Sequence, residues 1–586
     1  MWAKLLVHSA GFPYVAQRLA TKSNKYLSDY IEAARATSFL HMPMNKRLSY
    51  ALGAVCACSL TSAQSIRPRL VVVISIDQFR ADYLERFAPH YLPARSAGTV
   101  GGFNYLKHQG ANFTDAHYDQ VPTATGPGHA TILTGSIPAL HGIVGNDWYD
   151  RKTGKGVYCV EDASSTTVGG PSKPMSPRNL LVTTVGDELK MATNGKAKVV
   201  SVAFKDRASI LLAGHAPDAA IWFDTLNGDW VTSSFYANSL PAWVKQINDL
   251  NVPDAGLNQT WKPLLPGGAY ALTRRAPFES QTPSNPVFAH SLNGDNPKSK
   301  YGNWTTSPQG QQYVFDTVKA AIKAESLGKD EISDLLTINL STNDYVGHAY
   351  GPNSPEVMDI SVATDRMLSD LFTALEKSIG LSNILIAVTA DHGVVPIPEE
   401  AQKIYRLPAL RLDRALVIDS INESLEASYG KGQWVLSFGA PHLYLNRALA
   451  SSVKADFSEV ARTAADAAMS VPGIASAFTS EQIREGRLPS WPWAKLVANG
   501  FFQGRAGDVY VLESPGTYFG GGTGTGHGSA WAYDTHVPIL LSGFGVKAGV
   551  YSERVSVTDL APTLTKLLGI EQPNGNVGRV LTPAMK

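Results

Sequence analysis

The sequence predicts an α/β protein with a mostly parallel central sheet and helices on both faces. Short apolar segments rich in β-branched residues are bounded by turn residues, at 70–76, 198–204, 335–340, 384–389, 508–512 and 537–541. Helix-like segments lie between several of them, at 313–325, 355–378 and 557–568. Apolar strands that alternate with helices are typical of a sheet that is buried on both faces. In such sheets the reactive side chains gather beyond the carboxyl ends of the strands.

Two long segments depart from this alternation. Residues 215–310 are rich in Trp, Pro, Asn and Gly, which favours an irregular cap. Residues 399–506 contain strand-like and helix-like pieces of their own, which favours a small α/β insertion. We therefore expect both segments to be additions to one main domain.

The composition permits a large core. The chain has 586 residues, of which 44% are hydrophobic and 17% charged, and its net charge is +1 at pH 7. These values argue against a disordered chain. So balanced a charge gives no reason to expect a nucleic-acid or membrane-surface partner.

Residues 44–63 are typical of an export signal. Lys46 and Arg47 precede an apolar run at 48–60, and small residues at 61–63 suit a signal peptidase. The run is shorter than the roughly 20 apolar residues that a membrane span needs. We expect a periplasmic or secreted protein with no membrane span after signal removal. Residues 1–43 are then a misread or non-native start; the alternative is a genuine extension followed by a buried helix.

Cysteine usage fits this interpretation. Cleavage after Ala63 would remove Cys56 and Cys58 and leave only Cys159, so we expect no internal disulfide. Cys58 fits a lipid-attachment site only weakly.

Three carboxylates and three imidazoles follow predicted strands: Asp77 in SIDQFR, Asp344 and His348 in STNDYVGHAYG, Asp391 and His392 in ADHG, and His527 in GGGTGTGHGSAW. Carboxylate and imidazole ligands together suit zinc, with Mn and Fe as possible substitutes. Six ligands exceed the needs of one tetrahedral zinc, so two metal ions are the economical interpretation. Each motif alone fits an ordinary loop hydrogen bond, and it is their joint placement after several strands that indicates a site.

Thr125 is the candidate nucleophile. It lies in VPTATGPGHATILTG, before a short helix-like segment. The unpaired backbone N–H groups at the start of such a helix favour binding of an anion. Metal coordination would favour the alkoxide of its hydroxyl group. Thr123 is a rival within the same segment, and a plain helix cap is the alternative role for Thr125.

Three further side chains suit a phosphate oxyanion. Lys205 and Arg207 follow the 198–204 segment in FKDRASILLAGH, and Asn146 lies in VGNDWYD. Arginine offers a bidentate fork to phosphate and lysine a point charge. The alternative for Lys205 and Arg207 is a solvated edge of the sheet.

These motifs, in this order from about residue 67 to the C-terminus, resemble the alkaline phosphatase superfamily. The resemblance is to its nucleotide pyrophosphatase/phosphodiesterase-like branch, and most closely to bacterial phosphate-irrepressible alkaline phosphatases with a threonine nucleophile. It implies that residues 67–586 form an alkaline phosphatase-like catalytic domain. Family members often carry a bulkier residue where this chain has Gly126 and Pro127.

The resemblance implies two Zn²⁺ per chain and a phosphothreonine intermediate at Thr125. One zinc would be held by Asp344, His348 and His527. The other would be held by Asp77, Asp391 and His392, with Thr125 also on it. Asn146, Lys205 and Arg207 would bind the non-bridging phosphate oxygens.

The expected activity is hydrolysis of small-molecule phosphate monoesters to inorganic phosphate by a monomer. Diesterase members lack the paired charge of Lys205 and Arg207, so these residues favour monoesters. A phosphodiesterase or nucleotide pyrophosphatase on the same scaffold is the alternative. A sulfatase fits poorly because Cys159 lacks the C/S-x-P-x-R context, and a non-catalytic metal-binding protein has no need of Thr125.

Overall fold

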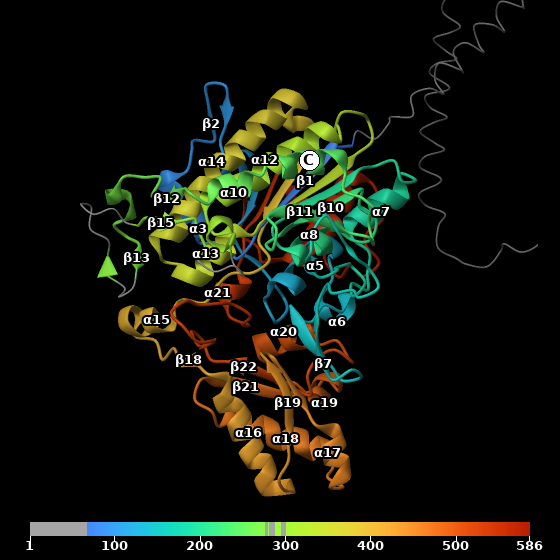
Figure 1. Cartoon of the computed structure of the whole chain (residues 1–586), viewed down its shortest axis with the longest axis vertical. Coiled ribbons are helices and arrows are strands. Elements are labelled where there is room, and N and C mark those ends of the chain that lie inside the picture. The colour runs from blue at the N-terminus through green and yellow to red at the C-terminus, as the bar shows by residue number, and fades with distance from the viewer. Residues whose placement is uncertain (1–66, 276–278, 281–287, 295–299) are drawn as a thin grey trace, which may run out of the picture. The chain divides into compact units, whose positions relative to one another are not determined.

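The computed structural model describes residues 67–275, 279–280, 288–294 and 300–586, and Arg67–Lys586 form one compact unit (Figure 1). The predicted signal 44–63, the segment 1–43 and two of the three cysteines lie outside the described residues. Among the described helices, none combines the length and hydropathy that crossing a bilayer requires.

A ten-stranded sheet forms the centre of this unit, in the order β25-β4-β24-β17-β1-β16-β9-β10-β11-β8. The inner strands β17, β1, β16, β9 and β10 are parallel, and antiparallel strands flank them. The bounds are β1 Leu70–Ile76, β4 Ala111–Phe113, β8 Thr167–Val168, β9 Val199–Ala203, β10 Ala219–Asp224, β11 Asp229–Ser233, β16 Asp334–Leu340, β17 Ile384–Thr389, β24 Ile539–Gly543 and β25 Gly549–Tyr551. The predicted fold class is confirmed.

Strand β1 lies in the middle of the sheet, between β17 and β16. All seven of its residues are buried, and Val72 pairs with Leu336 on one side and Ile386 on the other. Helices α12 (Pro308–Ala324) and α14 (Pro355–Ser378) lie on one side of the sheet, and α5 (Thr125–Thr134) and α8 (Asp206–Ala213) on the other (Figure 1). Burial on both faces explains why β1 reads as an unbroken apolar run rather than an alternating one.

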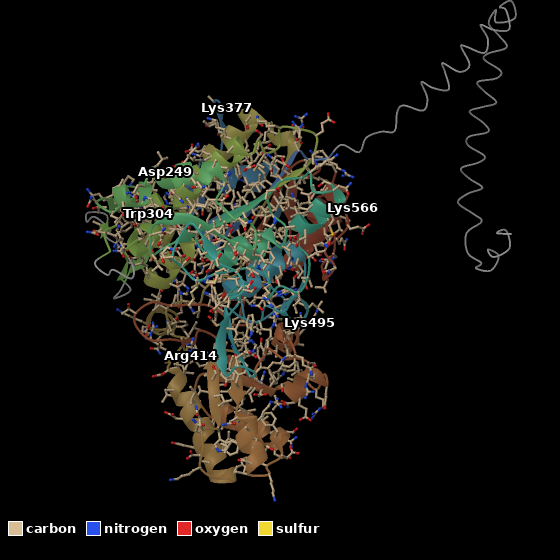
Figure 2. The ribbon with its side chains drawn as sticks, turned by 45° about the vertical axis from the view of Figure 1, so that its right-hand side comes forward. Asp249, Trp304, Lys377, Arg414, Lys495 and Lys566 are labelled. Atoms are coloured by element: carbon tan, nitrogen blue, oxygen red, sulfur yellow. The ribbon has the colours of Figure 1, made fainter. Side chains whose placement is uncertain are left out.

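One predicted strand belongs elsewhere. The 508–512 segment is β22 (Val509–Glu513), and it lies in a second, antiparallel sheet with strand order β19-β20-β22-β21. This sheet also contains β19 (Val435–Gly439), β20 (His442–Leu445) and β21 (Ile474–Thr479), and it packs on α18 (Phe457–Met469). Every residue of β22 is buried, with Val509 and Val511 in the core of this second sheet and Tyr510 and Leu512 in another apolar cluster, so its apolar run could not be told from a central strand. Arg414 marks the start of α16 (Arg414–Tyr429), which packs on α18 (Figure 2).

The 215–310 segment is not irregular throughout. It contributes β10 and β11 to the central sheet before its loops begin. Trp304, which is labelled in Figure 2, is buried and packs against Phe204, Phe223 and Tyr313. Trp230 and Trp304 therefore join this segment to aromatic side chains of the central sheet and α12.

Helix boundaries follow local capping. Helix α14 has the predicted bounds, and the Ser354 hydroxyl accepts a hydrogen bond from the Val357 N–H at its start. Helix α12 begins five residues before the predicted 313, because Ser307 caps it and Pro308 occupies its first turn. The 557–568 segment is a 3₁₀ turn (Val557–Asp559) followed by α22 (Leu560–Leu568).

Candidate active site

Three parallel strands bring three carboxylates together. Asp77 directly follows β1, Asp391 follows β17, and Asp344 lies in α13 (Thr342–Tyr350), directly after β16. Strands β17, β1 and β16 are neighbours that run in the same direction, so their carboxyl ends meet at one edge of the sheet. All three carboxylates are buried.

Two Asp/His groups form at this edge. In the first, the carboxylate of Asp344 lies 3.1 Å from Nε2 of His348 and 3.8 Å from Nε2 of His527. In the second, Nε2 of His392 lies 3.3 Å from Asp391 Oδ2 and 3.6 Å from Asp77 Oδ1. These are the two sets that the sequence resemblance implies.

Backbone carbonyls orient all three histidines. Nδ1 of His348 lies 2.7 Å from the Thr525 carbonyl oxygen, Nδ1 of His527 lies 2.8 Å from that of Thr123, and Nδ1 of His392 lies 2.8 Å from that of Gly393. A carbonyl can only accept, so each Nδ1 carries the proton and each Nε2 presents a lone pair. This is how proteins commonly orient histidine as a metal ligand.

The second group contains buried ligand atoms that lack a hydrogen-bond partner. Oδ1 of Asp77 and Nε2 of His392 have none, while outside the group Oδ2 of Asp77 has only its ion pair with Lys205 and Oδ2 of Asp391 only its contact with His129 Nδ1 at 3.3 Å. Burial lowers the pKa of His392 to about 3, so a neutral nitrogen lone pair faces the carboxylates. Burial and the neighbouring Asp77 raise the pKa of Asp391 well above its usual range. The donor set and its unpartnered atoms fit a divalent metal ion.

The first group is electrostatically different. Burial opposes ionisation of Asp344, but His348 and Lys205 hold its pKa well below the usual range. Burial also opposes a charge on His348, and Asp344 raises its pKa nonetheless. The Asp344 carboxylate therefore stays ionised and is available as an anionic ligand.

The two groups adjoin each other. Lys205 Nζ lies 2.8 Å from Asp77 Oδ2 and 2.5 Å from Asp344 Oδ2, and so bridges both. The rings of His392 and His527 stack with their centroids 3.5 Å apart. Gln78 also joins the groups: its backbone N–H donates to Asp391 and its side-chain amide to Asp344.

Thr125 lies beside these groups, as the first residue of α5. Its Oγ1 lies 3.2 Å from Arg207 Nη2 and 3.5 Å from Lys205 Nζ. The rival Thr123 is turned away, because its hydroxyl donates to the Ser529 carbonyl at 2.7 Å. The geometry therefore favours Thr125 over Thr123 as the reactive hydroxyl.

Asn146 and Arg207 are both held in place near Thr125. The side-chain oxygen of Asn146 accepts a hydrogen bond from the Gly126 N–H at 2.7 Å, which leaves its amide N–H groups free. A Cβ at residue 126 would lie 3.1 Å from Cys159 Sγ and 3.2 Å from Asn146 Oδ1, so glycine gives this contact its room. Arg207 donates to the Tyr158 hydroxyl at 3.0 Å, while its buried Nε has no partner.

Sequence reasoning missed His129 and Gln78. His129 lies one turn after Thr125 in α5, and its Nδ1 lies 2.9 Å from the Thr125 carbonyl and 3.3 Å from Asp391 Oδ2. Asn339 Nδ2 can only donate to His129 Nε2, so Nδ1 carries the proton and ties the nucleophile's backbone to Asp391. The i,i+4 spacing of Thr125 and His129 was the available signal.

Gln78 adopts a left-handed backbone conformation, with φ of 61°. Such strain in a non-glycine residue is typical of functional sites.

The prediction that His527 follows a strand of the central sheet was wrong. The strand before it, β22, belongs to the second sheet, and a glycine-rich loop carries His527 to the site. The Thr525 hydroxyl donates to the Val395 carbonyl, and Asp534 accepts from the Gly528 and Ser529 N–H groups. These hydrogen bonds fix the loop beside the residues that follow β17.

Known proteins share this arrangement in sequence and fold. The profile of the type I phosphodiesterase / nucleotide pyrophosphatase family matches residues 71–537. The chain belongs to this family. The match includes both Asp/His groups together with Thr125, Lys205 and Arg207.

Several relatives within the type I phosphodiesterase / nucleotide pyrophosphatase family are similar over nearly the whole chain. Alkaline phosphatase PhoV of Synechococcus elongatus is 37% identical over 89% of this chain and 93% of that protein. Alkaline phosphatase PafA of Elizabethkingia meningoseptica is 36% identical over 91% of this chain and 98% of that protein. The crystal structure of wild-type PafA matches with a TM-score of 0.81 at 35% identity, covering 89% of this chain and 99% of that one.

Proposed function

We propose that this protein is an alkaline phosphatase that hydrolyses phosphate monoesters through a phosphothreonine intermediate at Thr125. One observation carries the proposal: Thr125 Oγ1 lies between the cationic side chains of Lys205 and Arg207 and beside two Asp/His groups. The similarity to PhoV and PafA, both named alkaline phosphatases, supports it.

Two zinc ions would be held by the groups Asp344/His348/His527 and Asp77/Asp391/His392. When bound, they would supply Lewis acidity that favours ionised hydroxyl groups and stabilises charge on phosphate oxygens. Carboxylate and imidazole ligands suit zinc better than magnesium, which prefers oxygen ligands alone.

Thr125 would act as the nucleophile. Its oxygen forms a bond to phosphorus while the bond from phosphorus to the ester oxygen breaks, and the released alcohol takes up a proton. Water then attacks phosphorus, the bond to Thr125 breaks, and inorganic phosphate leaves. The N-terminal position of Thr125 in α5 favours the negative charge that develops there.

Lys205, Arg207 and Asn146 would bind the non-bridging oxygens. Burial opposes the charge on Arg207, but Tyr158 and Asp206 raise its pKa well above the usual range. Its unpartnered Nε–H and the free amide N–H groups of Asn146 are donors with capacity for an anion. A monoester dianion offers more acceptor oxygens than a diester, which would leave donors unsatisfied at about 1–3 kcal/mol each.

A phosphodiesterase or nucleotide pyrophosphatase on the same scaffold is the second candidate, and the family match is what favours it. The two are distinguished by kcat/KM on a monoester and a diester with the same leaving group, measured on the zinc-loaded protein. The proposal expects the monoester to be preferred by at least about tenfold. A preference for the diester would reject it.

We further propose that the mature protein is periplasmic or secreted and acts as a monomer on small-molecule esters. The basic, apolar and small-residue segments of 44–63 support export. N-terminal sequencing of the exported protein tests this: cleavage after Ala63 is expected, and a chain that begins near Met1 would contradict it.

A further inference from the structure

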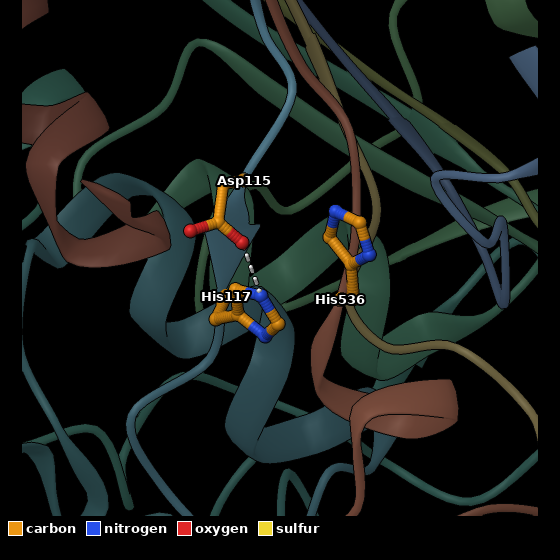
Figure 3. A group of neighbouring side chains, drawn as sticks. All are labelled: Asp115, His117 and His536. Carbon is orange, nitrogen blue, oxygen red and sulfur yellow. Dashed lines mark hydrogen bonds and ion pairs between the residues drawn. The ribbon is translucent and has the colours of Figure 1, made fainter. Parts of the chain in front are cut away.

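A third group of metal-capable side chains lies outside the active site. Asp115, His117 and His536 each offer a ligand atom, and these atoms lie within 4.8 Å of one another. Figure 3 shows Asp115 and His117 on one segment, with the ring of His536 facing them from the segment that follows α21 (Ala532–Thr535). We propose that this group binds one divalent metal ion of the zinc type, as a structural site separate from the catalytic pair.

The backbone around the group is firmly paired. His117 ends β5 (Ala116–His117), which pairs with β26 (Val555–Ser556), and an antiparallel bridge joins His117 to His536. The Tyr118 N–H donates to the Thr535 carbonyl at 2.9 Å, and the Val537 N–H donates to the Ala116 carbonyl at 3.0 Å. The ligand positions are therefore set by strand pairing rather than by side-chain rotamers alone.

His536 has one ring nitrogen held by the protein and one free, whereas both ring nitrogens of His117 have polar partners, one of them the candidate ligand Asp115. His536 Nε2 donates to the Thr114 carbonyl at 2.9 Å, which leaves its Nδ1 lone pair free. His117 Nδ1 lies 3.1 Å from the Thr535 hydroxyl, and its Nε2 lies 2.9 Å from Asp115 Oδ1. A cation at Nε2 would displace the proton to Nδ1, where the Thr535 hydroxyl can accept it.

The two rings are stacked, with centroids 4.6 Å apart and an angle of 12° between their planes. Binding therefore requires one ring to turn about its Cβ–Cγ bond so that both lone pairs converge on the ion.

The charge and exposure of the group suit a metal ion. The side chain of Asp115 is 44% exposed, so an ion can enter from solvent. The nearby cation Arg554 pairs with Asp119 at 2.8 Å, which offsets its repulsion. Two imidazoles and one carboxylate are a ligand set for zinc, with a position left for water.

A metal ion here would join two segments that lead to the active site. Tyr118, next to His117, donates through its hydroxyl to the carbonyls of Gly128 in α5 and Ala390 before Asp391. On the other segment, Asp534 holds the backbone after His527. We therefore expect the ion to stabilise the fold without taking part in the reaction.

The first test counts bound zinc. The wild type and the variants His536→Ala, Asp115→Asn and His108→Ala are equilibrated with buffered Zn²⁺, and zinc per chain is measured by mass spectrometry on protein shown to be folded by circular dichroism. His108 is an exposed histidine in α4 (Phe103–Gln109) and belongs to none of the three groups, so it is the matched control. Each site variant should hold one zinc fewer than the wild type and His108→Ala. Equal counts in all four proteins would overturn the proposal.

The second test separates this site from the catalytic pair. The double variant Asp77→Asn/Asp344→Asn removes a carboxylate ligand from each catalytic group. It should still bind one zinc per chain and show a higher Tm in zinc than in chelator, and adding His536→Ala should abolish both effects. A folded double variant that binds no zinc would refute the third site, whatever the outcome for the proposed phosphatase activity.

Discussion

Arg207 Nη2 lies 3.2 Å from Thr125 Oγ1, although 82 residues separate the two in the chain. Helix α8 carries Arg207 and packs against α5, whose first residue is Thr125. The guanidinium is anchored from behind by the Tyr158 hydroxyl, which in turn donates to Asp206 at 2.5 Å. The cation is therefore fixed where a phosphoryl group on Thr125 would place its oxygens.

Thr125→Ala should remove the nucleophile. We expect kcat/KM on a monoester to fall by about 10⁴-fold or more, as for other enzymes that lose a covalent nucleophile. Thr123→Ala is the matched control two residues away, because its hydroxyl bonds only to the Ser529 carbonyl. It should cost less than about tenfold. Steady-state kinetics on both zinc-loaded variants check this, and a larger loss in Thr123→Ala would exchange the two roles.

Lys205→Ala and Arg207→Ala should separate monoesters from diesters. Removing one preorganised donor to a developing anion costs about 10²–10³-fold in rate. We expect losses of that size on a monoester and smaller losses, within about tenfold, on a diester with the same leaving group. Arg207→Lys keeps the positive charge but loses the bidentate guanidinium donors. Its monoester kcat/KM should therefore lie between those of the wild type and Arg207→Ala. Equal losses on both substrates would show that these residues are structural.

The three carboxylates of the site, together with His348 and His392, could be predicted because the strands before them have a strong local signal. The β1, β16 and β17 segments are buried on both faces, so each reads as an apolar run that ends at a polar residue. The parallel order of these strands then forces Asp77, Asp344 and Asp391 to one edge.

Other parts depend on contacts that no local pattern encodes. Whether β22 joins the central or the second sheet is decided by its pairing with β20 and β21, not by its own apolar run. His129 looks like an ordinary buried helix residue until Asn339 and Asp391 are placed around it. The Asp115/His117/His536 group unites residues more than 400 positions apart.

Removal of metal should abolish turnover. Dialysis against a chelator is expected to leave no more than about 1% of the monoesterase activity, because the proposed metal ions supply the Lewis acidity that favours an ionised Thr125 hydroxyl group and stabilises charge on the phosphate oxygens. Zinc should restore activity better than magnesium at equal free concentration. Protein dialysed without chelator is the control. Full turnover in metal-free protein, verified by elemental analysis, would contradict the two-metal proposal.

Glu513 should make the fold less stable at the alkaline pH where this enzyme is expected to work. Burial at the end of β22 raises the pKa of Glu513 from 4.5 to about 7. Between those values the folded protein holds a proton that the unfolded chain has released, so stability falls as the pH rises through this window. At about 1.4 kcal/mol per pKa unit, the full loss is roughly 3 kcal/mol.

Glu513→Gln removes this ionisation while keeping the shape of the side chain. The variant should have a higher Tm than the wild type at pH 9, where the wild-type carboxylate is charged, and a Tm within a few degrees of it at pH 4.5, where both are neutral. Glu331→Gln, at an exposed position, is the control and should change the Tm little at either pH. Calorimetry at the two pH values checks the prediction. Since the argument rests on the sign of the difference, a Glu513→Gln protein that gains stability only at pH 4.5 would refute it.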